Sequence, residues 1–245
     1  GTAYLNGASQ PLAHFTLREI PEQPDIPDVP EVPEEPPKGF ARLVKESANT
    51  EITENNSCYS LGGAQYGVYQ NRACTQLETT LITDTRGRSD TVELETGTYY
   101  VKEKQAPKGY ILDTQVHTVK VSEGKTSVIR VSDEPVHDMA AIELYKIDRG
   151  TRMPGAEGAA SLENARFRVN FYQGYYDKEH LPGKPARSWV LKARTGEPAD
   201  QAARSGRLLE ETEKVSGDEF YKVGNTITLP LGTISVEEVQ PPAGY

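Results

Sequence analysis

The sequence contains an internal repeat, and this repeat constrains the fold more than any single motif. The stretch from Tyr99 to Tyr110 resembles the stretch from Ile234 to Tyr245 when both are counted back from their Gly-Tyr ends. Two further landmarks precede these stretches in the same order: Leu43-Val44-Lys45-Glu46 with Leu144-Tyr145-Lys146-Ile147, and Leu61 to Tyr69 with Leu162 to Val169. Three landmarks in one order predict two copies of one domain.

The two copies differ at their carboxyl ends. The first copy continues for roughly 25 residues after its Gly-Tyr, whereas the chain stops at Tyr245, where the second copy reaches the same point. We therefore expect a first domain over residues 39–136 and a second over residues 137–245 that lacks its last strand.

The local pattern predicts that both domains are all-β. Thr, Val and Tyr recur in short alternating runs that are broken by Gly, Asn and Asp, as in Thr98–Val101, Val116–Val121 and Thr126–Val131. Such runs are typical of half-buried antiparallel strands. We expect tandem antiparallel β-sandwiches.

A proline-rich segment precedes the first domain. Pro21, Pro24, Pro27, Pro30, Pro33 and Pro36 recur at every third position with acidic residues between them. Polyproline II has three residues per turn and rises about 3.1 Å per residue, so residues 21–38 are predicted to form an acidic spacer roughly 50 Å long. A PxxP ligand is the weaker alternative, because such ligands usually carry basic flanks. Residues 1–20, with alternation at His14–Arg18, are expected to end a preceding domain.

Composition and charge exclude several classes of partner. No window holds the run of about 18 apolar residues that a membrane span requires, so no membrane insertion of this segment is expected. The net charge is −9 and no basic cluster is present, which argues against nucleic acid and anionic lipid as partners. The chain begins without Met or a signal peptide, so we expect an internal piece of a longer protein.

Several ionisable residues occupy positions that alternation assigns to the interior. Lys45, Glu103 and Asp133 each share a strand face with apolar residues two positions away, and Lys146 and Glu238 do the same in the second copy. An unpaired buried charge costs several kcal/mol. One interpretation is a buried salt-bridge network, or strand ends that fray into solvent. The other is covalent: a desolvated Lys loses its proton and becomes a nucleophile that attacks the Asp carboxyl, while a neighbouring buried Glu keeps its proton and hydrogen-bonds the Asp carbonyl.

A resemblance to a known family favours the covalent interpretation. The stretch Val101-Lys102-Glu103-Lys104-Gln105-Ala106-Pro107-Lys108-Gly109-Tyr110 resembles the E-box of the collagen-adhesin B-type (Cna B, SpaA-like) domains of Gram-positive surface proteins and pilins. That family has a prealbumin-like sandwich related to immunoglobulin folds, in which a first-strand Lys, an E-box Glu and a last-strand Asn or Asp form an intramolecular isopeptide bond. The resemblance implies that Lys45 is the nucleophile, Glu103 the proton shuttle and Asp133 the acceptor.

The second copy follows the same pattern with two departures. Lys146 and Glu238 match the family's Lys and Glu, but the acceptor would follow Tyr245, so the bond is not expected to form within this chain. Pro241-Pro242 also replaces the Ala-Pro of the first E-box.

Cys58 and Cys74 are the two cysteines of the sequence. In an apparently secreted chain such a pair predicts a disulfide that closes a loop of about 15 residues and contributes roughly 3 kcal/mol. A metal site needs more ligands than these and four scattered histidines supply, so no metal and no cofactor are expected.

Together these features predict the structural stalk region of a cell-wall-anchored surface adhesin or pilin-like protein, located outside the cell and anchored through parts not present here. Its expected partners are the neighbouring domains of the same protein. No enzyme with turnover is expected, because isopeptide formation runs once per molecule. The alternative is a ligand-binding adhesin module for a host matrix protein or glycan, with Trp189 and the aromatic residues of 171–176 as a platform.

Overall fold

The computed structural model describes residues 35–150, 152, 161–194 and 208–245. The chain divides into two units, Gly1–Glu35 and Pro36–Tyr245, and all of the described strands belong to the second unit. The predicted end of a preceding domain at 1–20 and nearly all of the predicted spacer at 21–38 lie outside the described residues.

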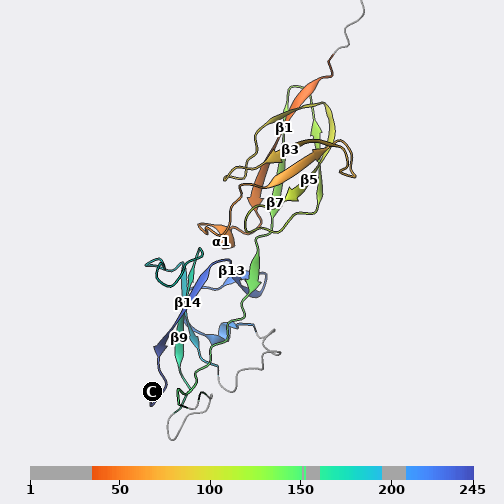
Figure 1. The fold of residues 1–245 in the computed structure, drawn as a ribbon. Coiled ribbons are helices and arrows are strands. Elements are labelled where there is room, and N and C mark those ends of the chain that lie inside the picture. The colour runs from red at the N-terminus through yellow and green to blue at the C-terminus, as the bar shows by residue number, and fades with distance from the viewer. Residues whose placement is uncertain (1–34, 151, 153–160, 195–207) are drawn as a thin grey trace, which may run out of the picture. The chain divides into compact units, whose positions relative to one another are not determined.

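The first sandwich packs two sheets face to face (Figure 1). The three-stranded sheet has the order β4-β1-β7 and the four-stranded sheet has the order β3-β2-β5-β6. Their bounds are β1 Lys38–Ser47, β2 Gln65–Tyr69, β3 Leu77–Ile82, β4 Val92–Glu95, β5 Gly97–Gln105, β6 Val116–Val121 and β7 Thr126–Asp133, with the short helix α1 at Thr50–Thr53. Alternate residues point inward, as in β1, where Ala41, Leu43 and Lys45 are buried.

One pairing in this sandwich differs from the antiparallel expectation. β1 and β7 are parallel neighbours, with Lys45 opposite Val131 and Ser47 opposite Asp133. A parallel pair requires a long crossover, which the intervening strands of the domain supply. The first and last strands of the sandwich therefore run side by side in the same direction.

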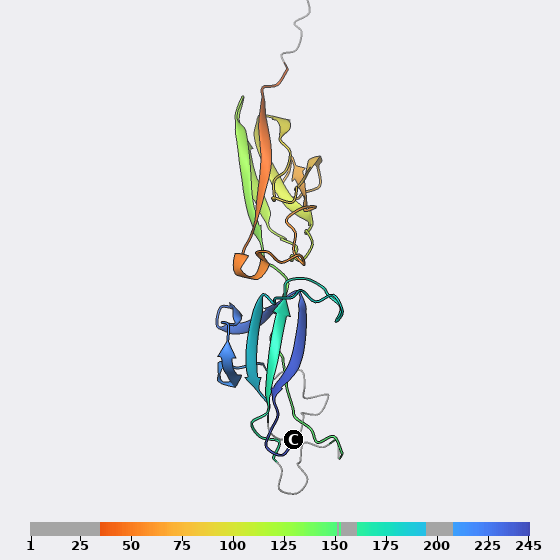
Figure 2. The ribbon, with the colours of Figure 1, turned by 90° about the vertical axis from the view of Figure 1, so that its left-hand side faces the viewer.

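The second sandwich repeats part of this arrangement. One sheet has the order β11-β10-β9-β14, whose strands lie side by side in Figure 2, and the other has the order β12-β13-β8. The bounds are β8 His137–Met139, β9 Arg166–Tyr172, β10 Arg187–Lys192, β11 Lys214–Gly217, β12 Tyr221–Val223, β13 Thr226–Pro230 and β14 Thr233–Gln240, with a 3₁₀ turn at Glu211–Glu213. The core contains Val169, Phe171, Trp189 and Leu191.

The register of the central strands supports the internal repeat. In the first sandwich β2 pairs with β5 so that Tyr66 lies opposite Glu103. In the second sandwich β9 pairs with β14 so that Phe167 lies opposite Glu238. The same pairs of positions were matched by sequence, so the two halves share strand register as well as motifs.

The loop after α1 contacts the second sandwich. The Asn56 side-chain amide donates a hydrogen bond to the Leu231 carbonyl (2.9 Å). The Tyr59 hydroxyl accepts one from the Leu231 backbone N–H (2.8 Å) and donates one to the Val136 carbonyl (2.6 Å). These hydrogen bonds connect Asn56 and Tyr59 of the first sandwich with Leu231, which is more than 170 residues later in the sequence.

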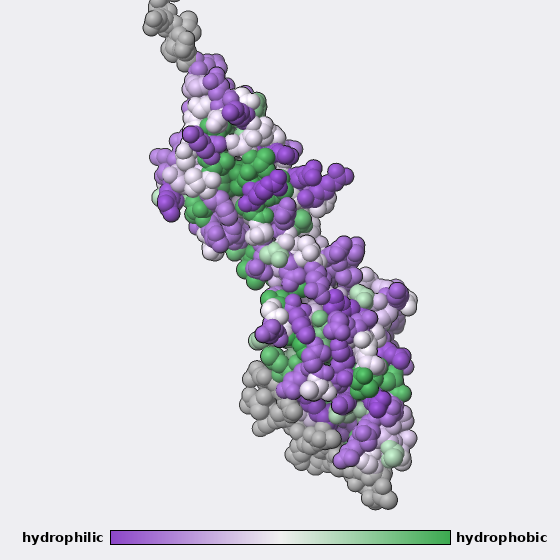
Figure 3. Space-filling model, turned by 180° about the vertical axis from the view of Figure 1, so that it is seen from behind, coloured by the Kyte–Doolittle hydropathy of each residue, from purple (hydrophilic) through white to green (hydrophobic). Residues whose placement is uncertain are grey.

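The described surface is largely polar. Figure 3 shows one face, on which hydrophilic residues predominate and hydrophobic residues form smaller patches. No helix among the described residues is long and apolar enough to cross a bilayer.

Candidate functional site

Three ionisable side chains meet between the two sheets of the first sandwich. Lys45 comes from β1, Asp133 from β7 and Glu103 from β5, and all three side chains have no solvent exposure. The Lys45 Nζ lies 2.9 Å from Glu103 Oε1, to which it donates a hydrogen bond, and 2.5 Å from Asp133 Oδ2. The burial that alternation predicts for these residues is observed.

The Lys45–Asp133 contact is an ion pair by distance but lacks the geometry of a hydrogen bond. Among the described residues, Asp133 Oδ2 has no hydrogen-bond partner despite the short approach of Nζ. The two groups are therefore in ionic contact through Oδ2, whereas Oδ1 is the Asp133 oxygen that accepts a hydrogen bond.

Strand pairing explains why these side chains meet. Lys45 lies opposite Val131 in the parallel β1–β7 ladder, and Asp133 is two residues further along the same face of β7. On the side of β1 away from β7, the Lys45 backbone is also held in place, because its N–H donates a hydrogen bond to the Gly87 carbonyl (2.7 Å). Gly87 has a φ of 74°, and a Cβ there would collide with the Lys45 carbonyl oxygen, so glycine is required for this close approach.

A fourth group of the site, the Tyr66 hydroxyl, was not predicted from the sequence. It accepts a hydrogen bond from Lys45 Nζ (2.6 Å) and donates one to Asp133 Oδ1 (3.4 Å). The alternation of Ala64, Tyr66 and Val68 was the available signal, since an inward Tyr needs a polar partner for its hydroxyl.

The backbone N–H of Asp113 was also missed. It donates to Glu103 Oε2 (2.7 Å), so both carboxylate oxygens of Glu103 have partners. This bond comes from the loop between β5 and β6, whose conformation no local sequence pattern specifies.

The buried environment raises the pKa of two groups of the site, Asp133 and Tyr66. Burial raises the pKa of Asp133 from 3.8 to about 6, although the adjacent Lys45 opposes the shift. Burial, and next the negative charges of Asp133 and Glu103, raise the pKa of Tyr66 far above its usual range. Asp133 therefore takes up a proton more easily than an exposed aspartate, protonation would make its carboxyl carbon more electrophilic, and Tyr66 keeps its proton.

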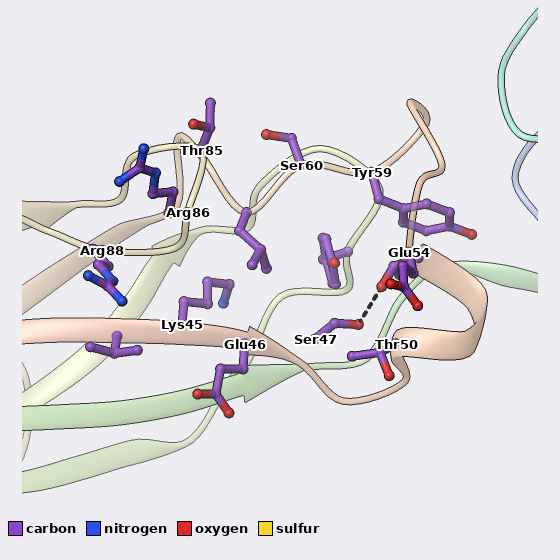
Figure 4. Close-up of a pocket in the computed structure, with 14 residues that line it drawn as sticks. Lys45, Glu46, Ser47, Thr50, Glu54, Tyr59, Ser60, Thr85, Arg86 and Arg88 are labelled. Carbon is purple, nitrogen blue, oxygen red and sulfur yellow. Dashed lines mark hydrogen bonds between the residues drawn. The ribbon is translucent and has the colours of Figure 1, made fainter.

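A cleft of about 660 Å³ lies beside this site, between the end of β1, α1 and the turn at Thr85–Arg88. In Figure 4 the Lys45 side chain points toward the interior and that of its neighbour Glu46 points the opposite way. Polar side chains line the cleft, including Ser47, Thr50 and Arg88. Solvent therefore approaches the neighbourhood of a site whose Lys45, Glu103 and Asp133 side chains are themselves fully buried.

Comparison with known families identifies the first sandwich. The family model for the SpaA prealbumin-like fold domain matches residues 39–135. Residues 39–135 form a SpaA prealbumin-like domain. No curated protein matches the chain.

Solved structures resemble the chain at low sequence identity. The Bacillus anthracis TIE protein has a TM-score of 0.48 and 23% identity, with 85% of this chain and 29% of that chain covered. A C-terminal fragment of the pilus adhesin SpaC from Lactobacillus rhamnosus GG has a TM-score of 0.43 and 14% identity, with 84% and 78% covered. BcpA, the major pilin subunit of Bacillus cereus, in its D312A form, has a TM-score of 0.35 and 21% identity, with 55% and 42% covered. The chain thus spans less than a third of the TIE structure.

The second sandwich brings its Lys and Glu together, but not in a buried site. Lys146 Nζ donates to Glu238 Oε2 (2.7 Å), and their side chains are 20% and 30% exposed. The predicted inward face of β14 is likewise open, since Ile234 and Val236 are exposed. The inward prediction is therefore wrong for Glu238. The inner face of a strand is buried by the opposing sheet: Tyr99 and Val101 of β5 belong to the core of the first sandwich, whereas none of the described residues of β14 belongs to the core cluster of the second.

The predicted disulfide is also wrong, because Cys58 and Cys74 are both free thiols. Cys58 is buried beside Tyr59 and Tyr110, whereas Cys74 lies in the turn between β2 and β3. The five-residue strand Gln65–Tyr69 lies between them in the chain, and at about 3.3 Å per residue it is longer than the roughly 7 Å between Cα atoms that a disulfide tolerates.

Trp189 and Phe171, which were candidates for an aromatic binding platform, are buried and do not form part of the surface. Trp189 is 1% exposed and packs against Phe220 in the core, and Phe171 is equally buried. Tyr175 and Tyr176 are the exposed members of the aromatic run. Among the described residues, no group of three or more His, Cys, Asp or Glu side chains is arranged to hold a metal ion.

Proposed function

We propose that this chain is a stalk region of a cell-wall-anchored adhesin or pilin-like protein, and that Lys45 and Asp133 join in an autocatalytic intramolecular isopeptide bond. The observation that carries the proposal is the convergence of Lys45, Glu103 and Asp133, all without solvent exposure, between the sheets of a SpaA domain. The domain family and the E-box resemblance supply the context.

The proposed chemistry uses each group in one role. Neutral Lys45 Nζ attacks Asp133 Cγ, and Glu103 accepts a proton from the nitrogen and delivers it to the departing oxygen. One water leaves and an amide links β1 to β7. Glu103 is regenerated, so the reaction runs once per molecule and the chain is not an enzyme with turnover.

The strand topology supports a mechanical role. The chain enters the parallel pair at the start of β1 and leaves it at the end of β7, so tension on the two ends loads the pair in shear. An amide between Lys45 and Asp133 lies near the exit of both strands. Tension then passes along β1, through the amide and out of Asp133, while the rest of the domain carries none.

The remaining parts of the proposal concern organisation and location. Residues 39–136 and 137–245 are two copies of one domain, preceded by the spacer at 21–38 and the end of another domain at 1–20. Lys146 and Glu238 are the nucleophile and proton shuttle of the second copy, whose acceptor strand follows Tyr245. We place the protein at the cell surface, with neighbouring domains as partners and a host matrix protein or glycan as the ligand of a distal domain.

The test is the intact mass of the purified full chain. We expect a mass one water below the sequence mass, and a tryptic fragment in which the peptides containing Lys45 and Asp133 are joined. Glu103→Ala should restore the full mass. Because Glu103 is buried, circular dichroism must show that the variant retains its β structure.

A matched control separates the site from its surroundings. Glu134 follows Asp133 and is exposed, so Glu134→Ala should keep the water deficit whereas Asp133→Ala should lose it. A wild-type mass equal to the sequence mass refutes the isopeptide, and a joined peptide that uses a carboxylate other than Asp133 refutes the assignment.

A further inference from the structure

Among the described residues, the Tyr66 hydroxyl is the third polar side-chain group in contact with the Lys45 nitrogen, after Glu103 and Asp133. It lies 2.6 Å from Lys45 Nζ and 3.4 Å from Asp133 Oδ1, and the Nζ lies 4.9 Å from the centre of the Tyr66 ring. This buried hydroxyl therefore contacts both the proposed nucleophile, Lys45, and the proposed acceptor, Asp133. Packing of the ring in the core does not by itself require either contact.

The site faces a proton-transfer problem before any bond can form. As an ion pair, Lys45 has no free lone pair and the Asp133 carboxylate resists attack, so one proton must move from nitrogen to the carboxyl oxygen. The direct contact between Nζ and Oδ2 lacks hydrogen-bond geometry. Glu103 accepts from Nζ through Oε1, so it is placed to take the proton that the nitrogen loses during bond formation, whereas the Tyr66 hydroxyl is hydrogen-bonded to both Nζ and Asp133 Oδ1 before any bond forms.

We propose that the Tyr66 hydroxyl relays this proton from Lys45 Nζ to Asp133 Oδ1 and is a third catalytic group of the site. This inference rests on the proposed isopeptide reaction. Tyr66 Oη takes a proton from the Lys45 ammonium as its own proton passes to Asp133 Oδ1, which leaves a neutral amine, a neutral carboxylic acid and an unchanged phenol.

The remaining steps balance with Glu103 alone. The amine forms a bond to Asp133 Cγ, Glu103 takes one proton from the nitrogen, and it returns that proton to the protonated Oδ1 oxygen. The Cγ–Oδ1 bond breaks and one water departs. Lys45 has then lost two protons, Asp133 one oxygen, and Tyr66 and Glu103 are as they began.

The internal repeat supplies a natural comparison for Tyr66. Phe167 holds the equivalent register position in the second sandwich, opposite Glu238 just as Tyr66 lies opposite Glu103. A phenylalanine is therefore accommodated at this place in the fold. Tyr66→Phe removes the hydroxyl and keeps the ring, and it reproduces the residue of the second copy.

The experiment follows bond formation in time. The full chain is made by a short pulse of cell-free translation, quenched in acidic denaturant at intervals, and the fraction lacking one water is read by intact mass. General acid–base groups contribute about 100-fold or more, so we expect Tyr66→Phe to slow the loss of water by about that factor. Tyr69→Phe is the matched control, because Tyr69 is on the same strand and makes no hydrogen bond to Lys45 or Asp133.

A second measurement keeps the shape of the site unchanged. Chains made with 3-fluorotyrosine retain every hydroxyl but make each more acidic, so a relay through Tyr66 should change the rate of water loss. The change should vanish when the same substitution of tyrosine is made in Tyr66→Phe. A wild-type rate in Tyr66→Phe, or no effect of fluorination, overturns the relay.

These outcomes are distinguishable from failure of the proposed function. If the wild-type chain never loses water, the isopeptide itself is refuted. If the wild type loses water and Tyr66→Phe does so equally fast, the bond stands and the relay alone is refuted.

Discussion

The isopeptide should remove one mechanical unfolding event, and the structure sets the size of that event. In Glu103→Ala, which we expect not to form the bond, tension should pull the whole first sandwich apart. With the bond in place, the chain between Lys45 and Asp133 lies outside the path of force. The perturbation therefore changes the length released and not merely the force required.

The expected length follows from strand geometry. Roughly 95 residues lie between Lys38 and Asp133, and an extended chain spans about 3.5 Å per residue. The folded pair of strands already spans about 30 Å, at about 3.3 Å per residue over ten residues. Unfolding of the unlinked domain should thus release about 300 Å, and the linked domain should release almost none.

Single-molecule stretching of the full chain, held at its two ends, measures this directly. The second sandwich is not expected to contain a bond, so it serves as an internal reference that unfolds in both proteins. We expect one event of this order in the wild type and two in Glu103→Ala. Two events in a wild-type chain whose mass shows the bond would refute the force path deduced from the parallel β1–β7 pair.

Two further predictions concern stability. In Glu103→Gln, burial, the first cause of the raised pKa of Asp133, remains while the charge of Glu103 is removed, so the folded state still binds a proton more readily than the unfolded state and stability should fall as pH rises above about 4; denaturant unfolding should show this slope, and adding Asp133→Asn should remove it. Tyr59→Phe leaves the Leu231 N–H without its partner and should destabilise the second sandwich by about 1 kcal/mol, read as a lower Tm beside a Tyr69→Phe control.

In the first sandwich, the alternation of apolar residues predicts correctly which ionisable side chains are buried. Period-two patterns place Lys45, Glu103 and Asp133 inside because each has apolar neighbours on its own face. Alternation assigns a face but not a partner strand. The parallel pairing of β1 with β7 was therefore not predicted, and neither was the position of Tyr66 between Lys45 and Asp133.

Two predictions are wrong because they depend on how the chain folds and not on the pattern within one strand. The predicted inward face of β14 is open because burial depends on the sheet that packs against a strand, which a local pattern does not contain. Cys58 and Cys74 are near in sequence, but the strand between them carries their thiols to different places. Sequence separation gives the length of a loop and not the distance between its ends.

The contrast between the two Lys–Glu pairs gives a physical reason for condensation in the first sandwich. Lys45 and its carboxylates have no solvent exposure, and burying an ion pair costs several kcal/mol per ion before the attraction is counted. An amide removes both charges, so condensation relieves this cost and fixes the fold at once. Lys146 and Glu238 keep part of their hydration, and the same driving force is smaller for them. Burial of the second pair should therefore precede any bond there, because desolvation supplies both the neutral amine and the incentive to form it.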